Sequence, residues 1–220
     1  MAVDQEPVID KAFAIAAVLT TSGAGLLINA FVLSAIIKIP IFGAAFGRIC
    51  VSQCLANCGQ MVLFAFFIGP MTIIDTNLLK TYLGARPGQL LNFFWYACIL
   101  AHLLSSINRL ICLMFPLKYN QIFTKEYTTL LLVFSWLLSF ALITPQFDND
   151  CLMVFVEEDF SFTFTDSQCG QVQATCVDFT LSVSVISVII LIDIATSVKI
   201  YCIKKVTTIN IGYCRCKGVI

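Results

Sequence analysis

Long stretches without a charged residue constrain the fold of this chain more than any other feature of its sequence. The hydrocarbon core of a bilayer is about 30 Å thick, and about 20 apolar residues of α-helix cross it. Since a backbone in lipid must satisfy its own hydrogen bonds, such stretches are expected to be helical. We therefore predict an all-α membrane protein, a bundle of five transmembrane helices. The predicted spans are about 12–37, 49–74, 88–115, 127–147 and 172–200.

The fifth span is the weakest of the five. Asp178 and Asp193 bracket its uncharged core over residues 179–192. We expect both aspartates to lie near the ends of this helix, where a charge costs little.

The composition agrees with a membrane protein and argues against a nucleic-acid-binding one. Hydrophobic residues make up 59% of the chain and charged residues 12%, and the mean hydropathy is +0.92. Soluble domains carry about 25% charged residues. Thirteen basic and thirteen acidic residues leave no net charge, so the basic excess that binds phosphates is missing. The partner that composition predicts is the lipid bilayer.

The basic residues between the spans set the expected orientation, because Lys and Arg collect on the cytoplasmic side. An outside N-terminus leaves three bases outside, Lys11, Lys80 and Arg86. It places the others in the cytoplasm: Lys38, Arg48, Arg109, Lys118, Lys125, Lys199, Lys204, Lys205, Arg215 and Lys217. The acidic connection over 148–170, which has no base, then also lies outside. We predict a multi-pass protein of the plasma membrane with its C-terminus in the cytoplasm.

The acidic connection carries a strand pattern. Residues 160–165 alternate aromatic and small polar side chains with a period of two, and an apolar run over 152–156 precedes them. This predicts a short extracellular β-hairpin over the outer mouth of the bundle. Cys151 and Cys169 flank it in an oxidising compartment, where a disulfide could form, with Cys176 as a competing partner.

Catalytic and metal chemistry are poorly represented. His102 is the only histidine and lies in mid-span, without an HExxH, GxSxG or P-loop pattern. Cys50, Cys54 and Cys58 share a helix face, but no His, Asp or Glu accompanies them, which favours packing over metal binding. We expect no enzyme, no cofactor and no metal site.

The most informative motif follows the third span. It reads Asn-Arg-Leu at residues 108–110 and Pro-Leu-Lys-Tyr at residues 116–119. This segment resembles the DRYxxIxxPLxY signature of rhodopsin-like G-protein-coupled receptors, with Arg, Pro, Leu and Tyr at the family's spacing. The resemblance implies that the G-protein-coupling motif consists of Asn108, Arg109, Pro116 and Tyr119.

Residues of other spans fit the same family. Asn29 lies midway along the first span, and in the fourth span Trp136 is followed by Pro145. The resemblance implies structural roles for all three.

The details are most similar to the nematode chemoreceptors of serpentine receptor class X (Srx). Residues 46–53 resemble the FG-x-x-C-x-SQ opening of that family's second span, and residues 115–123 and the connection with cysteines at 151 and 169 also match. The resemblance covers about residues 12–205. It implies a receptor-like transmembrane domain over 1–205, holding the first five helices of a seven-helix fold. Residues 206–220 form a cytoplasmic tail outside the family pattern.

Several departures from the wider receptor family bear on its function. Gly59 stands near the position of an aspartate that helps to bind sodium, so no sodium site is expected. Gly84 stands near the place of the usual cysteine of the third span, which favours the pairing of Cys151 with Cys169. Asn108 replaces an aspartate that holds the neighbouring arginine, so Arg109 should be less restrained, and high basal activity is one hypothesis.

The end of the chain departs furthest, because no sixth or seventh apolar span follows residue 205. We interpret the sequence as a fragment or splice form, or as a form that acts through a partner. Cys214 and Cys216 lie among basic residues, a pattern compatible with lipidation, although an ending produced by splicing or gene prediction is favoured.

The leading functional hypothesis is a chemosensory G-protein-coupled receptor that binds an extracellular small molecule or peptide. It would signal to a heterotrimeric G protein if completed by further spans. Its candidate ligand pocket contains Phe94, Trp95, Tyr96 and His102. One alternative is a truncated, non-signalling isoform that dimerises with full-length relatives. A transporter or channel subunit is less favoured, because few polar residues line a path through the spans.

Overall fold

Five long apolar helices make up most of the computed structural model of the chain, as the sequence predicts. The structure describes residues 6–38, 44–74, 81, 84–156 and 161–217, with side chains over 11–38, 45–74, 81, 84–156 and 161–205. Five segments within these residues have the length and composition to cross a membrane: Lys11–Lys38, Ala45–Ile74, Arg86–Met114, Lys125–Phe147 and Gln168–Lys205. The side chains of Cys214 and Cys216 lie outside the described residues.

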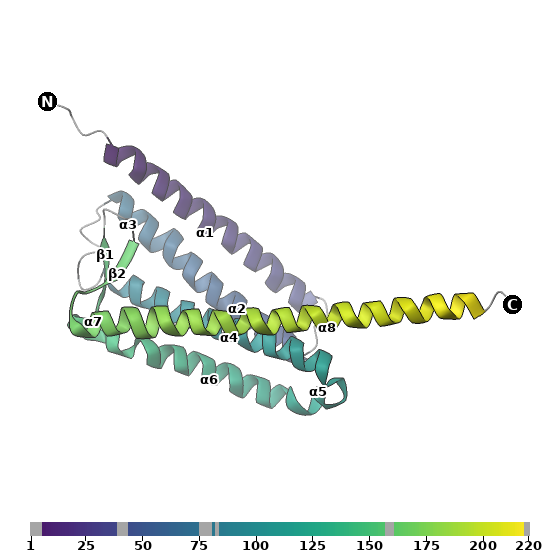
Figure 1. Ribbon diagram of the computed structural model, residues 1–220. Coiled ribbons are helices and arrows are strands. Elements are labelled where there is room, and N and C mark those ends of the chain that lie inside the picture. Colours follow the sequence, from purple (N-terminus) through teal and green to yellow (C-terminus); the bar gives the residue numbers. More distant parts are fainter. Residues whose placement is uncertain (1–5, 39–43, 75–80, 82–83, 157–160, 218–220) are drawn as a thin grey trace.

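Helix α4 (Arg86–Met114) is the centre of the bundle. It packs against α2 (Ala44–Leu63), α6 (Lys125–Ile143) and α8 (Leu181–Lys217), while α1 (Glu6–Lys38) lies against α2. Figure 1 shows α1 at the edge of the bundle and the C-terminal part of α8 projecting beyond the other helices. The short helix α5 (Pro116–Ile122) joins α4 to α6.

The outward faces of the helices are apolar. Large exposed side chains include Phe13, Phe31, Phe66, Phe134 and Leu191. In water such a surface would drive aggregation, whereas in a bilayer it faces lipid tails of the same polarity. The side chains buried inside the bundle include many small or polar ones, which let helices approach closely and form hydrogen bonds across their interfaces.

Two π-helical segments interrupt the spans. η2 (Phe64–Ile68) precedes α3 (Gly69–Ile74), and the amide of Gly69 donates to the carbonyl of Phe64, five residues back. Pro70 has no amide hydrogen and its ring displaces the preceding turn, which explains this wider turn. η6 (Gln173–Thr180) lies between the short helix α7 (Gln168–Val172) and α8.

A β-hairpin lies near one end of the bundle, as predicted from the alternating pattern (Figure 1). β1 (Met153–Val156) pairs antiparallel with β2 (Ser161–Phe164), in a register that places Met153 opposite Phe164. The acidic residues 157–159, which the sequence places at the turn, lie outside the described residues. Phe162 of β2 packs against a buried cluster formed by Leu63, Ile68 and Leu91.

The ends of the hairpin are joined covalently. A disulfide links Cys151, at the end of η5 (Asn149–Cys151), to Cys169 in α7, while Cys176 is a free, exposed thiol. The hydroxyls of Thr165 and Ser167 both donate to the carbonyl of Asp150. The connection between α6 and α7 is therefore held at its base by one covalent bond and two hydrogen bonds.

Removing the disulfide should destabilise this connection. Its cysteines are 18 residues apart, and closing a loop of that size stabilises a folded state by up to about 3 kcal/mol. We expect Cys151→Ser and Cys169→Ser to lower the thermal midpoint of the purified protein equally, and the double variant to lower it no further. Each single variant should also expose one new thiol to an alkylating reagent. Cys176→Ser, which removes a thiol that is already free, is the matched control; a shift as large in that variant would contradict the pairing.

Candidate functional site

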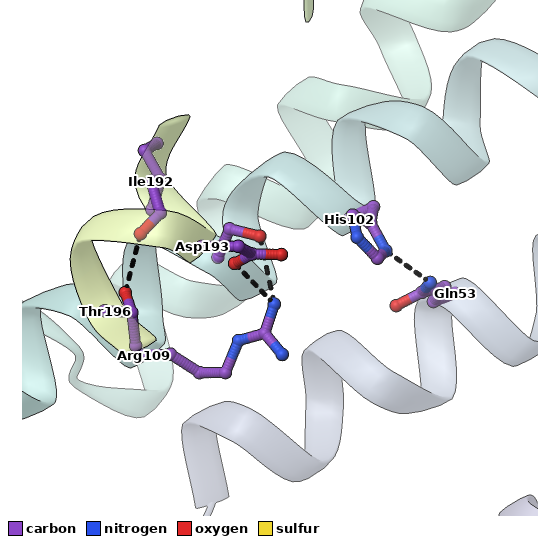
Figure 2. Close-up of polar contacts among 7 residues, drawn as sticks. Gln53, His102, Arg109, Ile192, Asp193 and Thr196 are labelled. Carbon is purple, nitrogen blue, oxygen red and sulfur yellow. Dashed lines mark hydrogen bonds and ion pairs between the residues drawn. The ribbon is translucent and has the colours of Figure 1, made fainter. Parts of the chain in front are cut away.

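One end of α4 carries an arginine held by an acidic residue of α8. The Arg109 guanidinium donates through Nη2 to Asp193 Oδ1 at 2.9 Å and to Ser106 Oγ at 3.1 Å. The Arg109 side chain is 43% exposed and that of Asp193 38% exposed. Figure 2 shows the two side chains reaching toward each other from α4 and α8. Because both are partly solvated, this ion pair is a weak link between the two helices.

The sequence predicts that Arg109 is less restrained without an aspartate at position 108, and the structure adds a restraint from another part of the chain. Asn108 indeed carries no charge, but Asp193 supplies a carboxylate 84 residues further along the chain. The sequence places Asp193 only near the end of the fifth span, where a charge costs little. It could not reveal the pairing, because the crossing of α4 and α8 determines which residues of the two helices meet. Asp193 is the functional candidate that the sequence pattern missed.

The other residues of the motif predicted to couple to a G protein lie beside this pair. Asn108 is buried, and its amide Nδ2 donates to the Tyr119 hydroxyl at 3.1 Å. Pro116 begins α5, where a missing amide hydrogen is harmless. Tyr119 stacks on Phe123, which belongs to a buried cluster with Ala45 and Ile49. The hydrogen bond between Asn108 and Tyr119 joins α5 to the end of α4. Both side chains are neutral, whereas the rhodopsin-like motif has a charged residue at the position of Asn108.

His102 lies deeper in the bundle than Arg109, on the same helix, and its side chain faces α2. Its Nδ1 is 3.0 Å from Nε2 of Gln53, and Figure 2 shows the ring turned toward α2. The geometry is that of a histidine satisfied by a core hydrogen bond rather than of an acid–base group beside a second titratable residue. Among the described residues, no group of three or more His, Cys, Asp or Glu side chains could hold a metal ion.

The residues expected to be structural join neighbouring helices. The Trp136 indole donates through Nε1 to Ser52 Oγ at 2.9 Å, which links α6 to α2. Asn57 donates through Nδ2 to Asn29 Oδ1 at 3.3 Å and accepts a hydrogen bond from the Cys98 thiol, which connects α1, α2 and α4. Pro145 lies in the 3-10 helix η4 (Thr144–Phe147) that follows α6.

The other end of α4 carries the aromatic residues predicted as a pocket, and they have different surroundings. Phe94 packs edge-on against Trp136. The Phe94 ring also fills the space beside Gly59, because a Cβ placed on that glycine would lie 2.5 Å from the Phe94 ring. Tyr96 is fully buried, and its hydroxyl lies 3.3 Å from Asp178 Oδ1. Trp95 is partly exposed and donates to Ser182 Oγ at 3.1 Å.

Of these aromatic residues, Trp95 lines two neighbouring cavities. The first, of about 370 Å³, lies between α4 and the η6–α8 segment and is lined by Asn92, Trp95, Asp178 and Ser182. The second, of about 310 Å³, lies between α2, α4 and the hairpin and shares Asn92 and Trp95 with the first. We call them the α8 cavity and the hairpin cavity. A larger groove of about 1030 Å³ lies between α2 and α6 and is mostly apolar, as expected of a surface that faces lipid. Like this groove, the α8 and hairpin cavities are open on one side.

Comparison with known proteins identifies a matching family and a similar protein. Residues 19–212 match the family model described as serpentine type 7TM GPCR chemoreceptor Srx. The chain is also similar to a curated protein of Caenorhabditis elegans named serpentine receptor class X 45, with 28% identity over 168 residues. The match covers 76% of this chain and 46% of the relative, so the chain spans about half the length of the curated relative it matches.

The hydrogen bond between Trp136 and Ser52 should contribute measurably to the stability of the bundle. Hydrogen bonds between membrane helices are worth about 0.6 kcal/mol on average. We expect a double-mutant cycle with Trp136→Phe and Ser52→Ala, measured by unfolding in detergent, to give a coupling energy of this size. Ser34→Ala is the control, since the Ser34 hydroxyl bonds only to the carbonyl of Ala30 on its own helix. A zero coupling energy between Trp136 and Ser52 would show that the bond is not stabilising.

Proposed function

The chain belongs to the Srx family of serpentine chemoreceptors, and on that basis we propose that it is a chemosensory receptor that binds an extracellular small molecule and couples to a heterotrimeric G protein in the cytoplasm. The outer end of the bundle is then the end with the hairpin and its two cavities. The end with Arg109 is cytoplasmic, in the orientation that the basic residues favour, and the plasma membrane is the expected location.

One observation carries the proposal: the same two segments are joined by a polar contact at each end. Tyr96 of α4 contacts Asp178 of η6 beside the α8 cavity, and Arg109 of α4 contacts Asp193 of α8 at the cytoplasmic end. Thirteen residues of helix separate Tyr96 from Arg109, which corresponds to about 20 Å. Because α8 continues directly from η6, a ligand that displaces η6 at the outer end also moves Asp193 relative to Arg109.

The ion pair between Arg109 and Asp193 is weak enough to be broken. A salt bridge between partly exposed groups contributes about 0–1 kcal/mol, which is small enough for ligand binding to overcome. Its opening would leave the Arg109 guanidinium exposed at the cytoplasmic face. A basic side chain at such a face can donate hydrogen bonds to backbone carbonyls or acidic groups of a G protein.

Arg109 is therefore expected to be essential for signalling and dispensable for folding. Since the chain spans about half of its curated relative, the test uses a chimera in which residues 1–205 replace the matching half of the C. elegans protein. We expect Arg109→Ala to abolish G-protein activation in a dissociation assay, with surface expression unchanged, and Arg109→Lys to retain part of the activity. Loss of surface expression in Arg109→Ala would instead assign the arginine to folding. If the intact chimera reaches the surface and never activates a G protein, the coupling proposal fails and a non-signalling partner of full-length receptors becomes the better account.

Asp193 gives the complementary prediction. Asp193→Asn removes the charge that holds Arg109 and keeps the size of the side chain. It should raise the ligand-independent activity of the same chimera, by up to about fivefold for an interaction of 1 kcal/mol. Asp166→Asn is the charge-matched control, because Asp166 is an exposed residue of the hairpin connection. Unchanged or lower basal activity in Asp193→Asn would show that the ion pair does not restrain the resting state.

A further inference from the structure

The α8 cavity contains a carboxylate with no cationic partner. Asp178 accepts one hydrogen bond, from the Tyr96 hydroxyl to Oδ1, and no Lys or Arg among the described residues forms an ion pair with it. Asp178 lies within a membrane-spanning segment and lines the cavity together with Trp95 and Ser182. An acidic group in such a segment is costly unless it binds a partner, and it commonly marks a functional site.

The same cavity contains a buried donor with no acceptor. Asn92 is 6% exposed, and its amide Nδ2 has no hydrogen-bond partner among the residues that the structure describes. A buried donor without a partner is destabilising, so the site is incomplete as it stands. Asn92 lines both the α8 cavity and the hairpin cavity. An acceptor atom on a bound molecule would satisfy this amide from either side.

The hairpin cavity offers a mostly apolar surface next to these polar groups. Phe64, Leu91 and Trp95 line it from α4 and the second span, and Met153 and Phe162 of the hairpin line its other side. Phe162 is held in place by close contact with α4, because a Cβ on Gly88 would lie 2.8 Å from its ring. An aromatic or aliphatic group of a ligand fits here, against the apolar side chains of the hairpin.

From this arrangement we infer that the two cavities together bind a small organic cation, with its ammonium group at Asp178, an acceptor atom at Asn92 and an apolar group under the hairpin. Trp95, which lines both cavities, contributes an aromatic ring that also attracts cations. The π-helical turn of η6 carries Asp178, and such turns are frequent at functional sites. The inference names the ligand class for the receptor function proposed above and rests on that function only for its biological setting.

The binding test uses the 220-residue chain in lipid nanodiscs and four matched probes. The first is 2-phenoxyethylamine, which carries an ammonium group, an ether oxygen and an aromatic ring. Replacing its ammonium gives the neutral 2-phenoxyethanol and the anionic 3-phenoxypropanoate, and replacing its ether oxygen by a methylene group gives 3-phenylpropylamine. Binding is followed by isothermal calorimetry and by tryptophan fluorescence, because Trp95 is one of only two tryptophans in the chain.

We expect the ammonium probe to bind at least tenfold more tightly than the alcohol and the carboxylate, and more tightly than 3-phenylpropylamine. Asp178→Asn should remove the preference over the alcohol, while Asp178→Glu should retain it. Trp95→Phe should remove most of the fluorescence response and weaken the binding measured by calorimetry, because a phenyl ring attracts cations less strongly than an indole ring. Asp166→Asn, which deletes an equal charge from the hairpin connection, should bind as the wild-type chain does.

Three results would overturn the inference: no binding of the ammonium probe, equal binding of the amine and the alcohol, or unchanged amine binding in a folded Asp178→Asn protein. Thermal unfolding of each variant verifies that it is folded. If Asp178→Asn does not fold, the binding test uses the Asp178→Glu protein. The result is separate from that of the signalling assay. Amine binding without G-protein activation would refute the proposed coupling alone, and activation of the chimera by neutral or anionic compounds alone would refute the ligand class alone.

Discussion

Polar contacts along α4 determine how this bundle is assembled. Lipid tails are as apolar as the outer faces of the helices, so the hydrophobic effect gives little preference for one packing over another. Buried polar groups do give a preference, because each needs a partner that lipid cannot offer. α4 contributes hydrogen-bonding side chains to α2 through Cys98 and His102, and to η6 and α8 through Tyr96 and the partly exposed Arg109. The position of α8 relative to α4 therefore depends on contacts at two separate levels.

The two contacts, of Tyr96 with Asp178 and of Arg109 with Asp193, differ in burial. The contact of Tyr96 with Asp178 is buried at the tyrosine, next to a cavity with an unsatisfied amide. The contact of Arg109 with Asp193 is partly solvated. In the function proposed above, a ligand would gain binding energy by satisfying the amide of Asn92, whereas little energy would be needed to separate Arg109 from Asp193. Coupling between the ends needs no special pathway, because one continuous helical segment carries both aspartates.

The candidate site was only partly predictable from the sequence. The motif that follows the third span predicts Arg109 and Tyr119 as site residues, and the aromatic run in that span predicts Trp95. The sequence does not predict the partners Asp178 and Asp193. Neither belongs to a motif, and the sequence indicates only that each is a charge near the end of a helix. Phe94 and Tyr96 are adjacent to Trp95 on the helix but point to different neighbours, so they do not line the two cavities that Trp95 lines. Their part in a ligand pocket stays a prediction.

The sequence by itself determined the five membrane-spanning helices and the hairpin. Both follow from local physics: a backbone in lipid must form helix, and a period of two places alternate side chains on opposite faces of a strand. Tertiary structure alone decided that Arg109 meets Asp193, that Asn108 bonds to Tyr119 and that Asp178 shares a cavity with Asn92. The contact of Asn108 with Tyr119 depends on how α5 turns back against α4, and the other two depend on the rotation and crossing of helices far apart in the chain. In lipid those are set by the sum of many small packing and hydrogen-bond energies, which no short stretch of sequence encodes.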